Sequence, residues 1–99
     1  MRQFDVHQLK SGTGGLILIL QNELTDMLDS CVVAPVTPAG QGTPITGLRP
    51  ALTFQGQNVV VAIDRMAAVE RRVIGRCEGT LRPFEAEFKA AIDLLFFGF

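Results

Sequence analysis

Several residues in this sequence could perform chemistry, and their spacing decides which chemistry is possible. His7 is the only histidine, in the stretch QFDVHQ, and no cysteine stands near it in the sequence. Phe4 and Val6 alternate with polar residues, which is typical of a half-buried strand. His7 would then point away from Val6, so the pattern favours a surface strand residue over a catalytic base.

The two cysteines each stand alone. Cys31 opens the apolar run CVVAPV, whereas Cys77 lies between Arg76 and Glu78. Metal-binding cysteines usually come in CxxC pairs or in clusters with histidine, and the sequence contains neither pattern. The sequence therefore predicts two reduced structural thiols, and no metal site or cofactor is expected.

The glycine-rich stretch SGTGG at residues 11–15 invites comparison with loops that bind phosphate. Such loops run into a helix and usually place a lysine and a hydroxyl residue against the phosphates. Here the apolar run LILILQ follows, which is typical of a strand. We therefore interpret SGTGG as a hairpin loop between the first two strands.

Basic residues concentrate in one stretch near the end of the sequence, namely Arg65, Arg71, Arg72, Arg76 and Arg82. Three acidic residues alternate with them: Asp64, Glu70 and Glu78. The net charge of the whole chain is −1, whereas a direct DNA binder would carry surplus positive charge. The pattern favours a solvated, self-neutralising face over a nucleic-acid groove.

The elements that must position these residues are mostly strands. We expect a single domain over residues 1–99, because 47% hydrophobic and 19% charged residues indicate a folded, associating chain. The expected strands are residues 3–8, 16–20, 31–36, 51–54, 59–63 and 71–75, with a hairpin turn at GQN. The segment TPAGQGTPITG, rich in proline and glycine, is expected to be an irregular loop.

The apolar run LILIL at residues 16–20 bears on both location and assembly. It is far shorter than the roughly 20 residues that a membrane helix needs, and MRQFDVHQLK lacks the features of a secretory signal. A cytoplasmic protein without a membrane partner is therefore expected. Because LILIL is apolar on both faces, one face should need a second layer or another subunit, and we expect a homodimer.

The hydrophobic period changes to 3.6 residues near Pro83, which predicts a helix over residues 83–97. Its core stripe comprises Phe84, Phe88, Ala91, Ile92 and Leu95, with Phe96 at the edge and Leu94 at the boundary. Phe97 falls on the opposite side with Ala86, Ala90 and Asp93. Phe97 either folds back near Gly98, is covered by a second copy, or serves as an exposed binding anchor.

Two blocks of the sequence, IDRMAAVERRVIG and FKAAIDLLFFGF, resemble the CcdB toxins of toxin–antitoxin systems. The stretches LILILQNELTDML, VVAPV and LRPALTF are similar to that family in order and spacing. The resemblance spans nearly the whole chain. It implies a mainly β fold with one C-terminal α-helix, in which an SH3-like barrel has a five-stranded antiparallel sheet and a small accessory sheet, and it implies a two-fold homodimer.

The resemblance also implies a function without catalysis. CcdB toxins serve plasmid maintenance as topoisomerase poisons: they bind the A subunit of DNA gyrase and trap the enzyme on cleaved DNA. A CcdA antitoxin neutralises them by wrapping a disordered segment over the toxin. DNA is involved only indirectly, through gyrase or through the toxin–antitoxin complex.

The resemblance assigns site residues position by position. The implied gyrase-binding residues are Phe97, Gly98, Phe99, Asp93, Leu24 and Thr25. The implied antitoxin-binding residues are Leu24, Thr25, Ala86, Ala90, Asp93 and Phe97. Phe97 stands where the family usually has tryptophan, which weakens cation–π stacking on a gyrase arginine. Asp93 replaces a neutral amide, and Thr25 replaces an aliphatic residue.

Two alternatives to a gyrase poison stay open. MazF and Kid toxins resemble CcdB in fold but are endoribonucleases, which need basic and acid–base residues that converge on a groove. Arg71, Arg72 and Glu70 are the residues available for that role, although the terminal FFGF has no use in RNA cleavage. The third possibility is a non-toxic structural dimer.

Overall fold

An antiparallel sheet makes up most of this protein, whose structure is a computed structural model that describes residues 1–10 and 15–99. Within these residues there are seven strands and one α-helix. The strands are β1 (Asp5–Leu9), β2 (Leu16–Ile19), β3 (Ser30–Pro38), β4 (Ala51–Phe54), β5 (Gln57–Val61), β6 (Ala67–Glu70) and β7 (Ile74–Thr80). The helix α1 (Glu85–Phe97) follows them. Short 3-10 helices are η1 (Glu23–Thr25), η2 (Ile63–Arg65), η3 (Arg71–Val73) and η4 (Arg82–Phe84).

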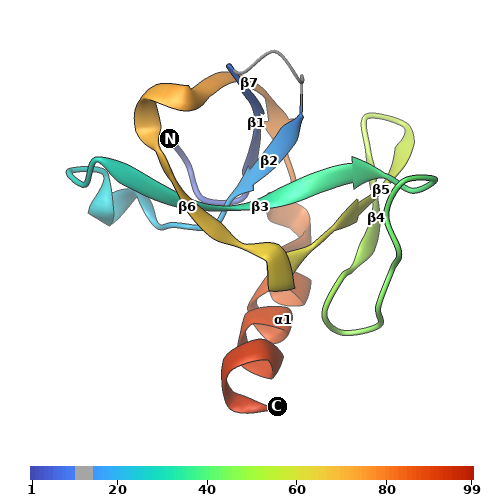
Figure 1. The fold of residues 1–99 in the computed structure, drawn as a ribbon. Coiled ribbons are helices and arrows are strands. Elements are labelled where there is room, and N and C mark those ends of the chain that lie inside the picture. Colours follow the sequence, from blue (N-terminus) through green and yellow to red (C-terminus); the bar gives the residue numbers. More distant parts are fainter. Residues whose placement is uncertain (11–14) are drawn as a thin grey trace.

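The long strand β3 organises the sheet, because it pairs with three other strands. Along one edge it pairs with β2, with Leu16 opposite Val36 and Ile19 opposite Val33. Along the other edge its first half pairs with β6 and its second half with β5. The resulting strand order is β4-β5-β3-β2-β1-β7. Strand twist curls the sheet into a half-barrel, with β6 and β5 at opposite ends of β3 (Figure 1).

The predicted fold class, mainly β with one C-terminal helix in an SH3-like barrel, is confirmed. The predicted strand count is not: the β4–β5 hairpin continues the same seven-stranded sheet instead of forming a separate accessory sheet. The sequence also missed β6, whose four residues AAVE carry no apolar alternation and are mostly exposed. The predicted strand at residues 71–75 begins too early, because η3 occupies Arg71–Val73 and β7 starts only at Ile74. The predicted SGTGG hairpin loop lies largely outside the described residues.

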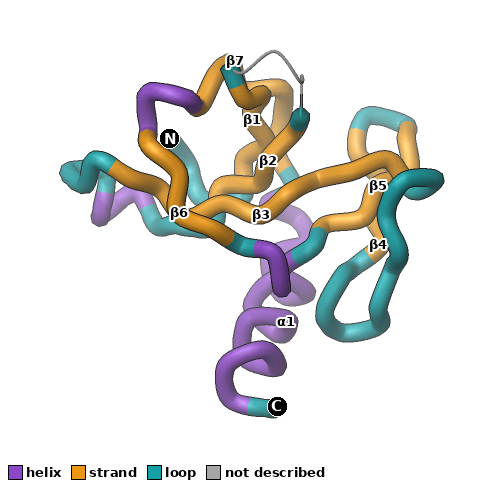
Figure 2. The backbone as a smooth tube through the Cα atoms, in the orientation of Figure 1, coloured by secondary structure: helices purple, strands orange, loops and turns teal. Residues whose placement is uncertain are grey.

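The sheet has an apolar cluster on each face. The larger cluster lies between the sheet and α1, and the smaller one comprises Ile17, Ile19, Cys31, Val33 and Ile74. Figure 2 shows why the second face is covered: the segment from β6 through η3 to β7 arches over β1 and β2. Cover for both faces of LILIL therefore comes from the same chain. This strand no longer provides a reason to expect a homodimer.

Burial explains the state of the thiol in the smaller cluster. Cys31 is almost fully buried, and desolvation raises the pKa of its thiol. A buried thiol with a raised pKa stays protonated and unreactive at neutral pH. The prediction of a reduced structural thiol thus fits Cys31, whereas Cys77 is exposed on β7 and free in the structure.

His7 is not the surface residue that the alternating pattern predicted. It is only 8% exposed, and its Nδ1 donates a hydrogen bond to the carbonyl oxygen of Gly75 at 2.9 Å. The register between β1 and β7 shifts on both sides of His7, so simple alternation fails there. The curled sheet then buries Val6 and His7, although they are adjacent in the strand.

The helix α1 is anchored near its beginning and leaves the sheet towards its end. Phe88 is completely buried, and its ring centroid lies 5.4 Å from that of Phe4. Ala91 is also buried, and Ile92 packs against the larger cluster. Leu95, predicted for the core stripe, is more than one-third exposed because the helix has run past the sheet by that point (Figure 1). In the described part of the chain, no helix is both long enough and apolar enough to span a membrane.

An ion pair fixes the loop between β3 and β4 beside this helix. The Arg49 guanidinium donates two hydrogen bonds to the Asp64 carboxylate, both at 2.7 Å, and both side chains are about one-fifth exposed. In the same loop, a Cβ at Gly47 would lie 3.4 Å from the Leu94 side chain of α1. The loop therefore flanks the exposed end of the helix and is tied to η2.

Acidification is expected to weaken this attachment. The hydrogen bond from Arg49 holds the pKa of the Asp64 carboxyl below its usual range. Because the folded-state pKa lies below the unfolded value, the pair contributes stability above the unfolded pKa and loses it as the pH falls through the folded-state pKa, below about pH 4. Urea unfolding over a pH series should detect this loss, and the variant Asp64→Asn should lack it. Identical acid profiles for the two proteins would contradict the prediction.

Candidate protein-binding site

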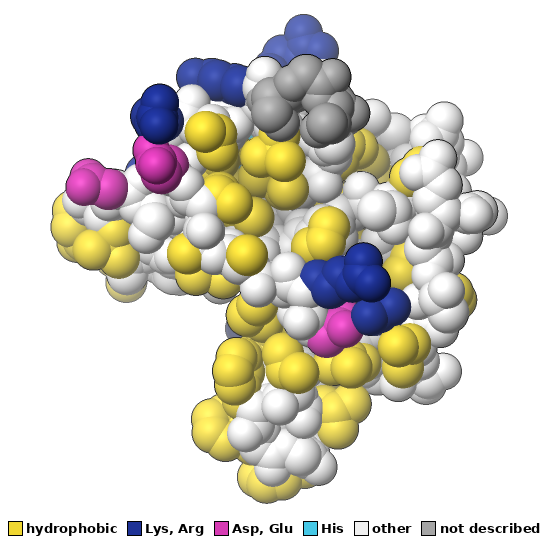
Figure 3. Space-filling view, in the orientation of Figure 1, with side chains coloured by type: hydrophobic (Ala, Val, Ile, Leu, Met, Phe, Trp, Pro, Cys, Tyr) yellow, Lys and Arg dark blue, Asp and Glu magenta, His cyan; other side chains and the backbone are white. Residues whose placement is uncertain are grey.

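The end of α1 is an exposed apolar surface, which we call the helix-end patch. It consists of Leu94, Leu95, Phe96, Phe97 and Phe99. Phe97 is 68% exposed and Phe99 is 88% exposed, so neither packs back onto its own subunit. Figure 3 shows apolar side chains covering the part of the helix that extends below the sheet. Exposed apolar patches rimmed by polar groups mark interaction sites more often than inert surface.

Gly98 sets the direction in which the chain leaves the helix. It has a φ of 81° and ends α1 with a hydrogen bond from its N–H to the Leu94 carbonyl oxygen at 3.0 Å. Glycine is favoured in this left-handed conformation because it has no Cβ. The turn separates Phe99 from Phe97, so the two rings occupy different parts of the helix-end patch.

One face of α1 leads to this patch and carries small side chains. Ala86, Ala90 and Asp93 are exposed, and with Phe97 they follow the spacing of a single helical face. The core residues Phe88 and Ala91 lie on the other side. Because Phe97 is exposed, it does not fold back onto its own subunit. It can still be covered by a second copy of the chain or act as a binding anchor.

A second apolar surface, the loop patch, consists of Leu24, Met27 and Leu28 between β2 and β3. All three are exposed, and Leu24 is 82% exposed. The Asn22 side chain caps η1 by accepting a hydrogen bond from the Leu24 N–H at 2.8 Å. The sequence pointed to Leu24 but not to Met27 and Leu28. The signal that could have identified Met27 and Leu28 is that they are large apolar residues within the mostly polar segment NELTDMLDS.

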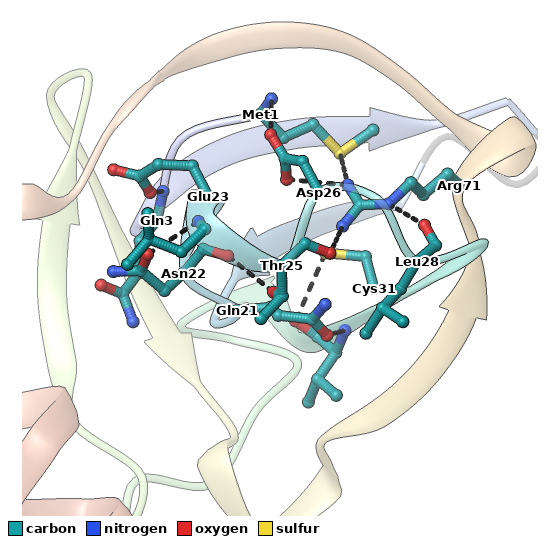
Figure 4. Close-up of polar contacts among 12 residues, drawn as sticks. Met1, Gln3, Gln21, Asn22, Glu23, Thr25, Asp26, Leu28, Cys31 and Arg71 are labelled. Carbon is teal, nitrogen blue, oxygen red and sulfur yellow. Dashed lines mark hydrogen bonds and ion pairs between the residues drawn. The ribbon is translucent and has the colours of Figure 1, made fainter.

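Arg71, at the start of η3, holds this loop in place, as Figure 4 shows. Its Nε donates to the Leu28 carbonyl oxygen at 2.6 Å, and its Nη2 donates to the Thr25 carbonyl oxygen at 3.4 Å. Its Nη1 lies 3.2 Å from Asp26, which also pairs with the amino group of Met1. A guanidinium with its donors engaged in this way is a scaffold for the loop patch.

The loop is also tied to the start of the chain. The Gln3 N–H donates a hydrogen bond to the Glu23 carboxylate at 3.1 Å, and this bond holds the pKa of Glu23 below its usual range. The Thr25 side chain is partly buried, and its hydroxyl donates a hydrogen bond to the Asn22 carbonyl oxygen at 2.7 Å. Leu24 therefore offers its side chain to a partner more openly than Thr25 does.

The structure does not bring all the predicted binding residues together within one subunit. Asp93, Phe97, Gly98 and Phe99 lie at the end of α1, whereas η1 with Leu24 and Thr25 lies at a separate corner of the molecule (Figure 1). A partner that contacts both surfaces must therefore span the subunit or meet them in an assembly.

The residues considered for ribonuclease chemistry do not converge either. Arg72 forms an ion pair with Glu70 on the surface, and Arg71 points into the loop network. Arg76 likewise pairs with Glu78, which confirms the predicted interleaving of charges for these pairs. A polar hollow does occur elsewhere, between the loop after β3 and η2. Its lining includes Thr37, Gln41, Thr43, Arg49 and Arg65.

Several solved structures match this fold over nearly the whole chain. An endoribonuclease from a mycobacterial species, in complex with its cognate antitoxin, matches with a TM-score of 0.78 at 13% identity, over 96% of this chain and 93% of that chain. The Mycobacterium tuberculosis toxin MazF-mt6 matches with a TM-score of 0.69 at 26% identity, over 93% and 95%. A crystal structure of an Mtb toxin gives 0.61 at 22% identity, over 95% and 99%. No curated protein matches the sequence.

The family match and the likeness to MazF-mt6 together support a toxin of a toxin–antitoxin system as the class of this protein. Within that class, the chain belongs to the CcdB protein family. The family's sequence model matches residues 3–98, nearly the whole chain.

Proposed function

We propose that this protein poisons DNA gyrase by binding its A subunit and trapping the cleaved-DNA complex. The observation that carries the proposal is the helix-end patch, where Phe97 and Phe99 stand exposed on either side of the Gly98 turn. Membership of the CcdB family supports it, because that family's gyrase contact resides in the matching residues. The protein contributes binding and no catalytic step.

The proposed contact with gyrase is mainly hydrophobic, and polar groups contribute little to it. Phe97 supplies a large ring without a hydrogen-bonding atom, so it gains binding free energy mainly by leaving water. Stacking on an arginine is weaker for phenylalanine than for tryptophan. Asp93 lies one helical turn before Phe97 and adds a negative charge beside a cation of the partner. Potency should therefore depend more on salt concentration than it would with an amide at that position.

The antitoxin segment lies along the face of α1 that carries Ala86, Ala90 and Asp93. Small exposed alanines let an extended chain approach the helix closely, and the segment then reaches Phe97 and blocks the gyrase contact. The loop patch with Leu24 provides a second attachment for the same partner. A disordered segment that wraps a surface can contact both places although they lie apart.

A homodimer is part of the proposal and now depends on the two exposed patches. Together they offer apolar area that a second copy could cover, whereas LILIL is already covered within the subunit. A two-fold contact would bring two helix ends or two loop patches side by side. Light scattering at micromolar concentration should report twice the chain mass of 10.7 kDa.

Induction in two strains tests the function directly. Growth should stop in cells with wild-type gyrase and continue in cells whose gyrase A subunit resists CcdB. Purified protein should also raise the yield of cleaved DNA in a gyrase reaction that contains wild-type enzyme. Equal growth arrest in both strains would overturn the gyrase assignment.

A MazF-type endoribonuclease is the second candidate, and the polar hollow with Thr37, Arg49 and Arg65 favours it. Arg49 already pairs with Asp64, so this candidate depends on the Arg65 guanidinium, which lies beside hydroxyl side chains and suits a phosphate chain. The structural neighbours include endoribonucleases. This reading predicts rapid loss of intact messenger RNA after induction, in both strains alike. Arg65→Ala should then relieve growth arrest, whereas a gyrase poison should tolerate that change.

Replacing Gly98 with alanine is expected to reduce growth inhibition without unfolding the protein. The left-handed conformation costs a non-glycine residue about 1 kcal/mol or more, and no atom lies within 4 Å of the added Cβ. The chain can relieve this strain by redirecting Phe99 away from its partner. Gly40→Ala is a matched control, since Gly40 has equally open surroundings and lies far along the chain in another loop. Full toxicity of Gly98→Ala would show that the turn does not position the contact.

A further inference from the structure

Three side chains with metal-binding atoms meet on β1 and β7, far from the helix-end patch. Asp5 and His7 are two residues apart on β1, and Cys77 stands opposite His7 on β7. A carboxylate oxygen of Asp5, a ring nitrogen of His7 and the Sγ of Cys77 all lie within 4.8 Å of one another. The sequence predicted no metal site because about 70 residues separate the two halves of this cluster.

A change of register creates the cluster. Val6 pairs with Gly79, so an uninterrupted ladder would place Glu78 opposite His7. The register instead shifts between Val6 and His7, which brings Cys77 opposite the histidine. Irregularities of this kind re-aim side chains and are common beside functional sites. The displaced Glu78 accepts a hydrogen bond from Gln8 and pairs with Arg76, so it turns away from the cluster.

The hydrogen bond of His7 prepares its ring for coordination. A carbonyl oxygen only accepts hydrogen bonds, so Nδ1 of His7 must carry the proton that it donates to Gly75 at 2.9 Å. In the neutral ring, Nε2 then holds the free lone pair. A backbone carbonyl behind one ring nitrogen is the usual way in which proteins fix the tautomer and orientation of a metal-ligating histidine.

We propose that Asp5, His7 and Cys77 bind a zinc ion, with the Cys77 thiolate, the His7 Nε2 and an Asp5 carboxylate oxygen as ligands. Tetrahedral zinc needs these atoms roughly 3.4–3.6 Å apart, given metal–ligand distances of about 2.0–2.3 Å. The Sγ of Cys77 lies 4.0 Å from Asp5 Oδ2, so a small rotation of these two side chains closes the site. The fourth position is left for water or a partner's ligand.

Charge and ligand type select the class of metal. On binding, the Cys77 thiol loses its proton to solvent, and the thiolate and carboxylate together neutralise the two positive charges of the ion. Sulfur and imidazole ligands favour zinc or cobalt over magnesium and calcium, which prefer oxygen. The ion would join the edge strand β7 to β1 and so secure the closing side of the half-barrel.

Titration of the purified, tag-free full-length protein with Co²⁺ tests the site. Equimolar Co²⁺ should produce a thiolate-to-cobalt charge-transfer band in the near ultraviolet, and Zn²⁺ should abolish it by displacement. Cys77→Ser should remove the band and weaken metal binding by at least about 100-fold, since losing even an outer-shell partner costs about 10- to 100-fold. Asp5→Asn should keep the band but weaken binding.

Cys31→Ala is the control, because it removes the other thiol and keeps all three ligands. It should retain the band and the rise in unfolding temperature that Zn²⁺ produces in the wild-type protein. The proposal is overturned if equimolar Co²⁺ gives no thiolate band. It is equally overturned if Cys77→Ser retains the band or if Zn²⁺ stabilises Cys77→Ser as much as the wild-type protein.

Discussion

Phe97→Ala is expected to abolish growth inhibition while the protein stays folded. Phe97 is 68% exposed at the end of α1, and its loss leaves no cavity in the core. Exposed substitutions usually change the free energy of unfolding by less than about 0.5 kcal/mol. Truncating a central aromatic contact in an interface costs about 2–4 kcal/mol, which weakens gyrase binding by about 30- to 700-fold. Induction assays and urea unfolding measure the two effects separately.

Phe88→Ala is the matched control on the same helix. Phe88 is fully buried against Phe4, and deleting a buried phenylalanine costs about 3–5 kcal/mol, a large part of the stability of a small domain. This variant should unfold or melt far below the wild-type protein. If Phe97→Ala were destabilised as strongly as Phe88→Ala, Phe97 would be a packing residue. If Phe97→Ala were folded and fully toxic, the contact would have to lie elsewhere.

The parts of the fold that the sequence predicted are those whose signals are local. Apolar content predicts the strand at LILIL, and turn residues between two apolar runs predict the β4–β5 hairpin. Both signals lie within a few positions of the sequence. The helix was predicted because its 3.6-residue period is sustained over four turns. The same period places Phe97 on the side of the helix opposite the core stripe, which predicted its exposure. These inferences need no knowledge of what lies across the sheet.

The parts that failed depend on pairing between distant segments. β6 is a strand only because the first half of β3 leaves an edge for it, and its own four residues carry no apolar pattern. His7 is buried because β7 pairs with β1 out of regular register. The same register brings Cys77 to His7 and Asp5. Sequence spacing contains no trace of such contacts.

The candidate site was predicted in part for a similar reason. Helical periodicity and the family resemblance both pointed to Phe97, but neither indicated that Arg71 from η3 would support the loop patch through contacts with Leu28, Thr25 and Asp26. Arg71 was considered for catalysis because of its charge. In the structure, Arg71 instead supports the loop through its hydrogen bonds and ion pair.

The shared fold does not decide between the two toxin activities, because the surfaces that would perform them differ. Endoribonuclease chemistry needs a polar groove, and the hollow near Thr37 and Arg49 is a candidate for it. Gyrase poisoning, as proposed, would use the helix-end patch. One half-barrel therefore offers two separate surfaces, and function must be argued from the residues on each. Variants on one surface should leave the activity of the other unchanged.

Ala90→Arg is expected to yield a toxin that its antitoxin can no longer neutralise. Ala90 is exposed in the middle of the helix face proposed for the antitoxin segment, and it is absent from the residues implied in gyrase binding. A long side chain there obstructs a peptide that packs closely against the helix. Arginine has nearly the helix propensity of alanine, so α1 should keep its stability.

Co-expression and calorimetry with the cognate antitoxin segment measure the outcome. Growth arrest should persist in the presence of antitoxin, and binding of the segment should weaken by at least about 30-fold, the cost of one strong interface contact. Ala39→Arg, the same change at an exposed alanine in the loop after β3, should be neutralised like the wild-type protein. Full neutralisation of Ala90→Arg would place the antitoxin elsewhere, on the loop patch or on the sheet. Loss of toxicity in Ala90→Arg would instead mean that gyrase uses this helix face as well, and that the two partners compete for one surface along its whole length.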